Sequence, residues 1–99
     1  MSGRPAAETV VKLFVTGRGS LADRAQRNLR RIGRMVDGLV VEVVDILENP
    51  DAADDERVVA TPLLIRLSPD PQKRIFGDLS DVDLVLAELE LEPAVAAAD

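Results

Sequence analysis

The pattern of apolar and polar positions divides the chain into strands and amphipathic helices. Val10–Thr16 is β-branched and apolar almost throughout, which is typical of a strand covered on both faces in the middle of an α/β sheet. From Leu21 to Val36, apolar residues recur at spacings of three and four, which predicts an amphipathic helix. Leu39–Leu47 is again apolar and predicts a second strand. Because a helix connects the two strands, we expect them to be parallel.

The polar residues around this first helix support its boundaries. Ser20 is predicted to cap the N-terminus, with Asp23 three residues further on, and Gly38 is predicted to end the helix. The polar face is rich in arginine. A face of this kind is usually solvated, and the alternative is a docking surface for an acidic partner. Its members are Arg24, Arg27, Arg30, Arg31 and Arg34.

A short acidic helix is predicted after the second strand, with Asn49 as its N-cap and Pro50 at its first position. It continues through Asp51–Arg57. The clustered carboxylates suggest a metal site, but the segment lacks the glycine and the final glutamate that an EF-hand loop needs. Acidic residues in a first helical turn stabilise the helix dipole, so we expect no metal here.

The most apolar stretch of the chain is Val58–Leu67. Proline has no N–H and cannot lie in the middle of a ladder, so Pro62 predicts a third strand at Leu63–Leu67. The Thr61–Pro62 bond is a candidate for the cis isomer, since the trans preference before proline is only about 0.5–1 kcal/mol. A Thr-Pro step into a buried strand, after a βαβα pattern, resembles a thioredoxin-like domain.

The rest of the chain contains a proline-rich turn, a fourth strand and a segment with two periods. Lys73–Gly77 is predicted to pair back as an antiparallel strand, and Ser80 is predicted to cap a last helix. Leu84–Glu92 begins at helical spacing, but from Leu89 it alternates leucine with glutamate, which is strand spacing. The helix propensity of Leu, Ala and Glu favours a helix over Asp81–Leu91.

Composition limits the classes of function. The 99 residues suffice for one domain, which we expect to span residues 10–91 between disordered segments at 1–9 and 92–99. A net charge of −6 and only two aromatic residues argue against a nucleic-acid partner. The sequence has no Cys and no His, which excludes dithiol chemistry and removes the most common general base and metal ligand. We therefore expect neither catalysis nor a cofactor.

The apolar runs and the residue at the start of the first helix bear on the protein's location and on an enzymatic function. No apolar run reaches the roughly 18 residues that a membrane span needs, and the N-terminus lacks the apolar core of a signal peptide, so a cytoplasmic protein is expected. Thioredoxin-like and glutathione-transferase-like enzymes hold a reactive or thiol-polarising group at a helix N-terminus, where this chain has Ser20. The absence of cysteine excludes redox activity of its own.

Four short motifs resemble those of the KaiB family over a stretch from about Val10 to Leu91. Each motif alone is weak. Their order and spacing, with the proline-rich turn between the last two, make the resemblance specific. The motifs are KLFVTG at 12–17, DILENP at 45–50, ATPL at 60–63 and RIFGDLSD at 74–81.

The resemblance implies a single α/β domain of thioredoxin-like βαβαββα order, acting as a non-enzymatic partner of a KaiC-like ATPase ring in circadian or clock-like timing or stress signalling. It also implies an alternative, tetramer-forming fold in which the C-terminal half is rearranged. Two such folds must lie within a few kcal/mol of each other. Slowly isomerising X–Pro bonds are compatible with such a switch, and the candidate positions are Pro62, Pro69 and Pro71.

The resemblance places partner contacts on the first helix and the second strand, and the residues to test are Arg24, Glu42 and Arg57. Glu88 stands where family members often have glycine, and a helix former there favours the thioredoxin-like state. The alternative function is a free-standing adaptor for a two-component histidine kinase. The sequence leaves open whether the protein is a monomer, a dimer or a tetramer, and whether a KaiA-like component takes part.

Overall fold

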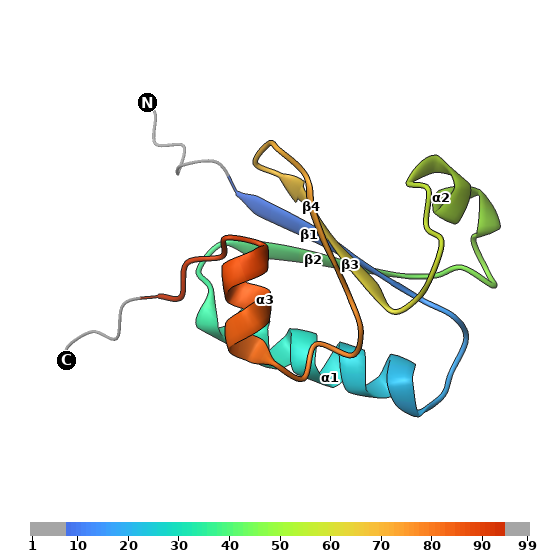
Figure 1. Ribbon diagram of the computed structural model, residues 1–99, viewed down its shortest axis with the longest axis horizontal. Coiled ribbons are helices and arrows are strands. Elements are labelled where there is room, and N and C mark those ends of the chain that lie inside the picture. Colours follow the sequence, from blue (N-terminus) through green and yellow to red (C-terminus); the bar gives the residue numbers. More distant parts are fainter. Residues whose placement is uncertain (1–7, 95–99) are drawn as a thin grey trace.

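The computed structural model describes residues 8–94, and this part of the chain forms four strands and three helices (Figure 1). The βαβαββα order is the one predicted from the sequence. In chain order, the elements are β1 (Thr9–Val15), α1 (Ser20–Met35), β2 (Leu39–Asp45), α2 (Pro50–Asp55), β3 (Leu63–Ser68), β4 (Lys73–Phe76) and α3 (Val82–Glu88).

The strands form one mixed sheet in the order β2-β1-β3-β4. β1 and β2 are parallel and pair over their whole length, from Thr9 opposite Leu39 to Val15 opposite Asp45. β3 is antiparallel to β1, and β4 is antiparallel to β3. The predicted parallel start and the predicted antiparallel hairpin are both confirmed. β1 and β3 are therefore central, and β2 and β4 are the two edges of the sheet.

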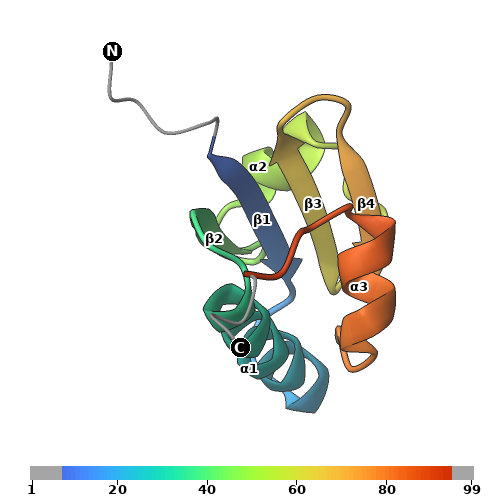
Figure 2. The same ribbon diagram turned by 90° about the vertical axis from the view of Figure 1, so that its left-hand side faces the viewer.

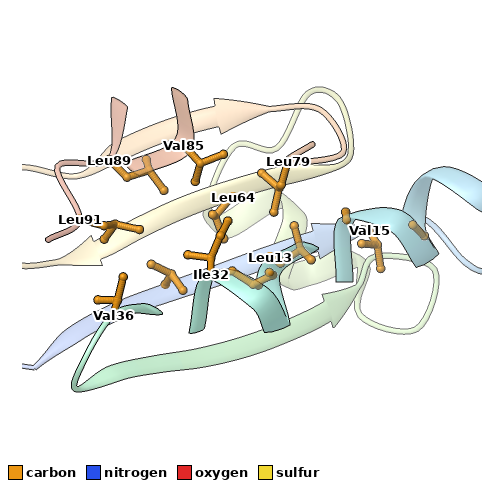
Figure 3. Close-up of a cluster of buried hydrophobic side chains, with 13 residues drawn as sticks. Leu13, Val15, Ile32, Val36, Leu64, Leu79, Val85, Leu89 and Leu91 are labelled. Atoms are coloured by element: carbon orange, nitrogen blue, oxygen red, sulfur yellow. The ribbon is translucent and has the colours of Figure 1, made fainter. Parts of the chain in front are cut away.

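α1 and α3 cover one face of the sheet, whereas α2 lies on the other (Figures 1 and 2). The main core lies beneath α1 and α3 (Figure 3). It combines the apolar stripe of α1 with alternate residues of the central strands and with the leucines around the end of α3. Its largest fully buried members are Leu13, Leu29, Ile32, Leu64 and Leu89.

A second, smaller core lies on the α2 face. It contains the buried residues Phe14, Val44, Leu63 and Ile65, with Ala52 of α2 packed against them. Successive residues of a strand point to opposite faces, so neighbouring residues of β1 belong to different cores. The predicted covering of the first strand on both faces is confirmed, because β1 residues in both cores are fully buried.

Both predicted serine caps are wrong. Ser20 is already the first residue of α1, and its N-cap is Gly19, which makes no side-chain capping bond. α3 is capped by Asp81 instead of Ser80, and the Asp81 carboxylate accepts a 3.1 Å hydrogen bond from the Leu84 N–H. Ser and Asp are both good caps, and the path of the chain into the helix decides between neighbours.

The ends of α1 also differ from the prediction, since two residues of its apolar stripe face solvent. Leu21 is 52% exposed and Met35 is 38% exposed. They lie at the two ends of the helix, next to Ala22 and Val36, which are buried.

The segment Leu84–Glu92, which fits both helix and strand spacing, contains the end of a helix that stops early. α3 stops at Glu88, before the predicted end at Leu91, and Glu90 takes a positive φ of 53°. This turn leaves Glu90 exposed while Leu89 and Leu91 are both buried in the main core. The alternation of leucine and glutamate therefore marks the end of a helix rather than a strand.

Residues 8–94 include no helix that is long and apolar enough to cross a membrane. Two residues from the segments expected to be disordered have defined roles. Thr9 begins β1, and the Ala94 N–H donates to the carbonyl of Met35 over 2.6 Å. Residues 1–7 and 95–99 lie outside the described part of the chain.

Candidate partner-binding surface

β2 is an edge strand with features that favour the addition of another strand. Among residues 8–94 its only neighbour in the sheet is β1, so its outer edge presents backbone N–H and C=O groups that no other strand of this part of the chain pairs. Edge strands are usually protected by proline, lysine, a bulge or short length. β2 has seven residues, contains neither proline nor lysine, and pairs with β1 without a bulge.

β2 exposes valines on both faces of the sheet, with Glu42 as the charged residue between Val41 and Val43. Val41 and Val43 lie opposite Val11 and Leu13, which point into the main core, so they lie on the α1 side. Val40 lies on the other face. The three valines are 41%, 41% and 44% exposed in chain order. This edge therefore combines unpaired backbone groups with partly exposed apolar side chains.

A hollow of ≈ 520 Å³ lies between the first half of α1 and the end of β2. Its polar lining comes from both elements and from the loops that precede and follow them. The lining side chains include Arg18, Asp23, Gln26, Val43 and Asn49.

Asp45 joins the two loops at the base of this hollow. Its Oδ1 accepts hydrogen bonds from the backbone N–H of Gly17, over 2.8 Å, and of Leu47, over 2.9 Å. Gly17 has a φ of +59°, and a Cβ there would lie 3.0 Å from the Leu47 side chain, so glycine is needed. β2 ends at Asp45 and not at the predicted Leu47, and the Leu47 N–H bonds to the Asp45 carboxylate instead of to β1.

Arg24 lies on the flank of α1 that faces the link between β4 and α3. Its Nε is 3.2 Å from Oδ2 of Asp78, and Asn28 donates to the Asp78 carbonyl over 2.8 Å. Hydrogen bonds from the Ser80 side chain and backbone, together with the Arg24 charge, hold the pKa of Asp78 below its usual value. The Arg24 side chain is 48% exposed and already has an internal partner.

Glu42 and Arg57 lie at opposite edges of the sheet. Glu42 is on β2, 3.8 Å from the Nζ of Lys12, on the face opposite α1. Arg57 follows α2, and its carbonyl accepts a 3.4 Å bond from Arg74 of β4, the other edge strand. The structure therefore does not bring Arg24, Glu42 and Arg57 into one site.

The three candidate prolines lie in two regions. Pro62 is buried at the start of β3, whereas Pro69 and Pro71 are exposed in the β3–β4 turn. The peptide bonds preceding all three are cis.

A second hollow, of ≈ 280 Å³, lies between Pro62 and the start of α1. The Thr16 and Thr61 hydroxyls are 2.7 Å apart at its edge, and Ser20 also lines it. This lining offers hydroxyl groups but no charged side chain that could activate a nucleophile. Nor do the described residues include a group of carboxylates arranged to hold a metal ion.

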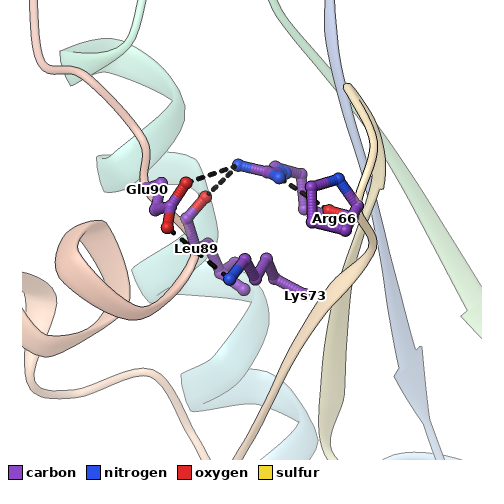
Figure 4. Close-up of polar contacts among 5 residues, drawn as sticks. Arg66, Lys73, Leu89 and Glu90 are labelled. Atoms are coloured by element: carbon purple, nitrogen blue, oxygen red, sulfur yellow. Dashed lines mark hydrogen bonds and ion pairs between the residues drawn. The ribbon is translucent and has the colours of Figure 1, made fainter.

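Sequence reasoning missed Arg66, which lies in the middle of the most apolar stretch and is 3% exposed. Its guanidinium donates from Nη1 to the Leu89 carbonyl over 2.8 Å and from Nη2 to the Pro71 carbonyl over 2.7 Å. Glu90 adds a carboxylate 3.9 Å from Arg66 Nη1 and 3.5 Å from Lys73 Nζ (Figure 4). Arg66 thus ties β3, the β3–β4 turn and the end of α3 together. An arginine inside an apolar run was the available signal.

The fold is shared with known thioredoxin-like structures. The N-terminal domain of Synechococcus elongatus SasA superposes with a TM-score of 0.70 at 21% identity, covering 88% of this chain and 86% of that one. Mitochondrial thioredoxin 3 of Saccharomyces cerevisiae superposes with a TM-score of 0.71 at 17% identity, covering 84% and 77%. These similarities confirm the predicted thioredoxin-like fold.

Sequence comparison identifies the family. The KaiB domain model matches residues 12–91. Circadian clock protein KaiB3 of Synechocystis sp. is 37% identical over 86 residues, which cover 85% of this chain and 84% of that protein. Circadian clock oscillator protein KaiB of Nostoc sp. is 38% identical over 84 residues, covering 83% and 78%. The KaiB resemblance seen in the four sequence motifs is confirmed, and the chain belongs to the KaiB family.

Proposed function

We propose that this protein is a non-enzymatic regulator that binds a KaiC-like ATPase ring in the cytoplasm, in circadian or clock-like timing or stress signalling. Family membership supports this class of function, since the curated relatives are named circadian clock proteins. The structural observation that carries the proposal is the free, apolar edge of β2 beside the α1–β2 hollow.

The chemistry of β2 suits strand addition. An extended segment of the partner would pair with the free backbone groups of β2, and main-chain hydrogen bonds of this kind provide much of the affinity in such complexes. Specificity would come from the side chains. Burying a valine completely stabilises a complex by about 1.5–3 kcal/mol, and Val41 and Val43 are still nearly half exposed, so about half of that remains available from each.

Arg24 is the second contact in this proposal, on the flank of α1 that faces the link between β4 and α3. Its half-exposed guanidinium would interact with an acidic group of the ring while keeping Asp78 as its internal partner. Arg24→Glu should abolish ring binding and leave the circular dichroism spectrum unchanged. If the variant still binds, Arg24 is not a contact.

The test of the β2 edge uses the KaiC-like ATPase from the same genome, purified as a ring with ATP and mixed with the full chain. Complexes are measured by native mass spectrometry and by titration. Wild type should bind, and Val41→Lys should weaken binding at least about tenfold, because it introduces a desolvated charge at the added strand. Val59→Lys is the matched control, since Val59 is 85% exposed and lies outside β2.

Each outcome separates the alternatives. Equal binding by the two lysine variants would remove the β2 edge from the proposal. Capture of a histidine kinase in place of the ring would favour the adaptor function. Turnover with glutathione and a model electrophile would contradict the non-enzymatic part.

A further inference from the structure

The charges of this chain are strongly segregated. The whole chain carries a net charge of −6, yet α1 exposes five arginine side chains to solvent. Arg24 has an internal partner in Asp78. Within residues 8–94, the other four make no ion pair, and we call them the arginine stripe: Arg27, Arg30, Arg31 and Arg34.

The arginine stripe is unfavourable in the isolated molecule. Four pairs of its members lie three or four residues apart and are therefore neighbours on the helix surface, where like charges destabilise a helix. The chain has eighteen acidic residues, but none within the described part lies close enough to form an ion pair with the stripe. A binding partner with carboxylates would relieve this repulsion.

The chain itself contains a matching acidic surface on α2. The acidic triplet, Asp51, Asp54 and Asp55, is exposed and forms no ion pair within the described residues. Its spacing of three and four residues is the same as that of Arg27, Arg30 and Arg31. Facing each other, the two sets would form three carboxylate–guanidinium pairs.

The two surfaces cannot neutralise each other within one molecule. α1 packs on the main core and α2 on the second core, so the sheet lies between them (Figure 2). In two different molecules, the arginine stripe of one can face the acidic triplet of the other. We propose that the arginine stripe of one molecule binds the acidic triplet of a second copy, head to tail. Because the two contact surfaces differ, the same contact can repeat along a row of molecules.

The contact should be weak and sensitive to salt. Exposed ion pairs contribute little individually, and they are screened over a Debye length of about 10 Å at 0.1 M salt. Association should therefore be visible at low salt and disappear at about 0.5 M salt. This inference does not depend on the ATPase ring, so it stands or falls separately from the proposed function.

The test is sedimentation equilibrium of the full chain at low salt, from micromolar to millimolar concentration. Arg27→Glu/Arg31→Glu and Asp51→Lys/Asp54→Lys should each associate at least about tenfold more weakly than wild type. An equimolar mixture of the two variants should associate again, because the intact stripe of one meets the intact triplet of the other. The glutamates introduced into the stripe of one variant are also complementary in charge to the lysines introduced into the triplet of the other.

The matched control is Glu88→Lys/Glu92→Lys, which reverses two exposed acids near the end of α3. It changes the net charge from −6 to −2, as Asp51→Lys/Asp54→Lys does. If only net charge mattered, both variants would associate more strongly than wild type. The proposal predicts that the control keeps its association and that the α2 variant loses it.

Three results would overturn the proposal. A wild-type protein that stays monomeric at millimolar concentration and low salt has no such contact. Association that survives 0.5 M salt and both reversals uses another surface, such as the β2 edge. Failure of the mixture to associate, when wild type does, would show that the stripe and the triplet do not meet.

Discussion

Arg66 is the one charged side chain that is buried in the described part of the chain, and among the charged residues it is the one whose removal should cost most. Arg66→Met replaces the guanidinium by a shorter, unbranched apolar side chain and leaves the Leu89 and Pro71 carbonyls without their donor. Hydrogen bonds to charged groups contribute about 1.5–3 kcal/mol each, so we expect a loss of about 2–4 kcal/mol in the free energy of unfolding. Urea unfolding followed by circular dichroism measures it.

Arg74→Met provides the comparison for Arg66→Met. Arg74 also donates to two backbone carbonyls, those of Glu56 and Arg57, but it is exposed to water. Its loss should cost less than about 1 kcal/mol, because water replaces the lost donor. If Arg66→Met loses no more unfolding free energy than Arg74→Met, the buried guanidinium does not contribute substantially to stability.

Asp78 should contribute to the pH dependence of stability. Its pKa is lowered in the folded state by the Ser80 side chain, the Ser80 backbone and Arg24, so the folded protein favours the charged carboxylate. The stability that results is present above the unfolded pKa of about 3.9 and is lost as the pH falls through the lower, folded pKa. Wild type should therefore lose its advantage over Asp78→Asn below about pH 4.

Carboxyl ¹³C titration by NMR checks the causes of the Asp78 shift. Ser80→Ala and Arg24→Gln should each raise the pKa of Asp78 toward its usual value, because each removes an interaction that favours the charged carboxylate. A variant that leaves the pKa of Asp78 unchanged would show that the replaced side chain does not contribute.

At the scale of elements, α3 is the described helix whose N-cap side chain makes a capping hydrogen bond. It has only seven residues, and isolated helices of this length are unstable in water. Asp81→Ala removes the side-chain bond to the Leu84 N–H and should cost about 1 kcal/mol in unfolding free energy. Asp83→Ala, in the same first turn but without a capping bond, should cost less. A larger loss from Asp83→Ala would contradict the assignment of the cap.

Elements were predicted well where the signal is local. Periodicity identified α1, and proline identified the entries into α2 and β3. The ends of elements were predicted less well. β2 ends at Asp45, whose carboxylate bonds to Gly17, 28 residues away, and no local pattern contains that contact.

At the scale of the molecule, we predict that the thioredoxin-like fold is the resting state in solution. NMR secondary shifts should show helix at 82–88 and strands at 63–68 and 73–76. Arg66 and the burial of Leu89 and Leu91 stabilise this arrangement of the C-terminal half. Strand shifts near residues 89–91, or two slowly exchanging sets of peaks, would instead indicate the alternative fold that the family resemblance implies.

The candidate site was predictable only in part. The resemblance pointed to the first helix and the second strand, and the structure has a free β2 edge beside a hollow next to α1. The individual residues could not be placed from sequence. Arg24 lies on α1, whereas Glu42 and Arg57 lie at opposite edges of the sheet, and such distances depend on strand order and helix packing.

The sequence by itself determined the kinds of element, their order and the classes of chemistry that are excluded, because periodicity, proline geometry and residue composition act locally or over the whole chain. The tertiary structure alone decided which strand is a free edge, that Arg66 holds the end of α3, and that the arginine stripe and the acidic triplet lie on opposite faces. These features depend on contacts between residues far apart in the chain, such as Arg66 with Leu89 or Asn28 with Asp78. Only packing brings such residues together.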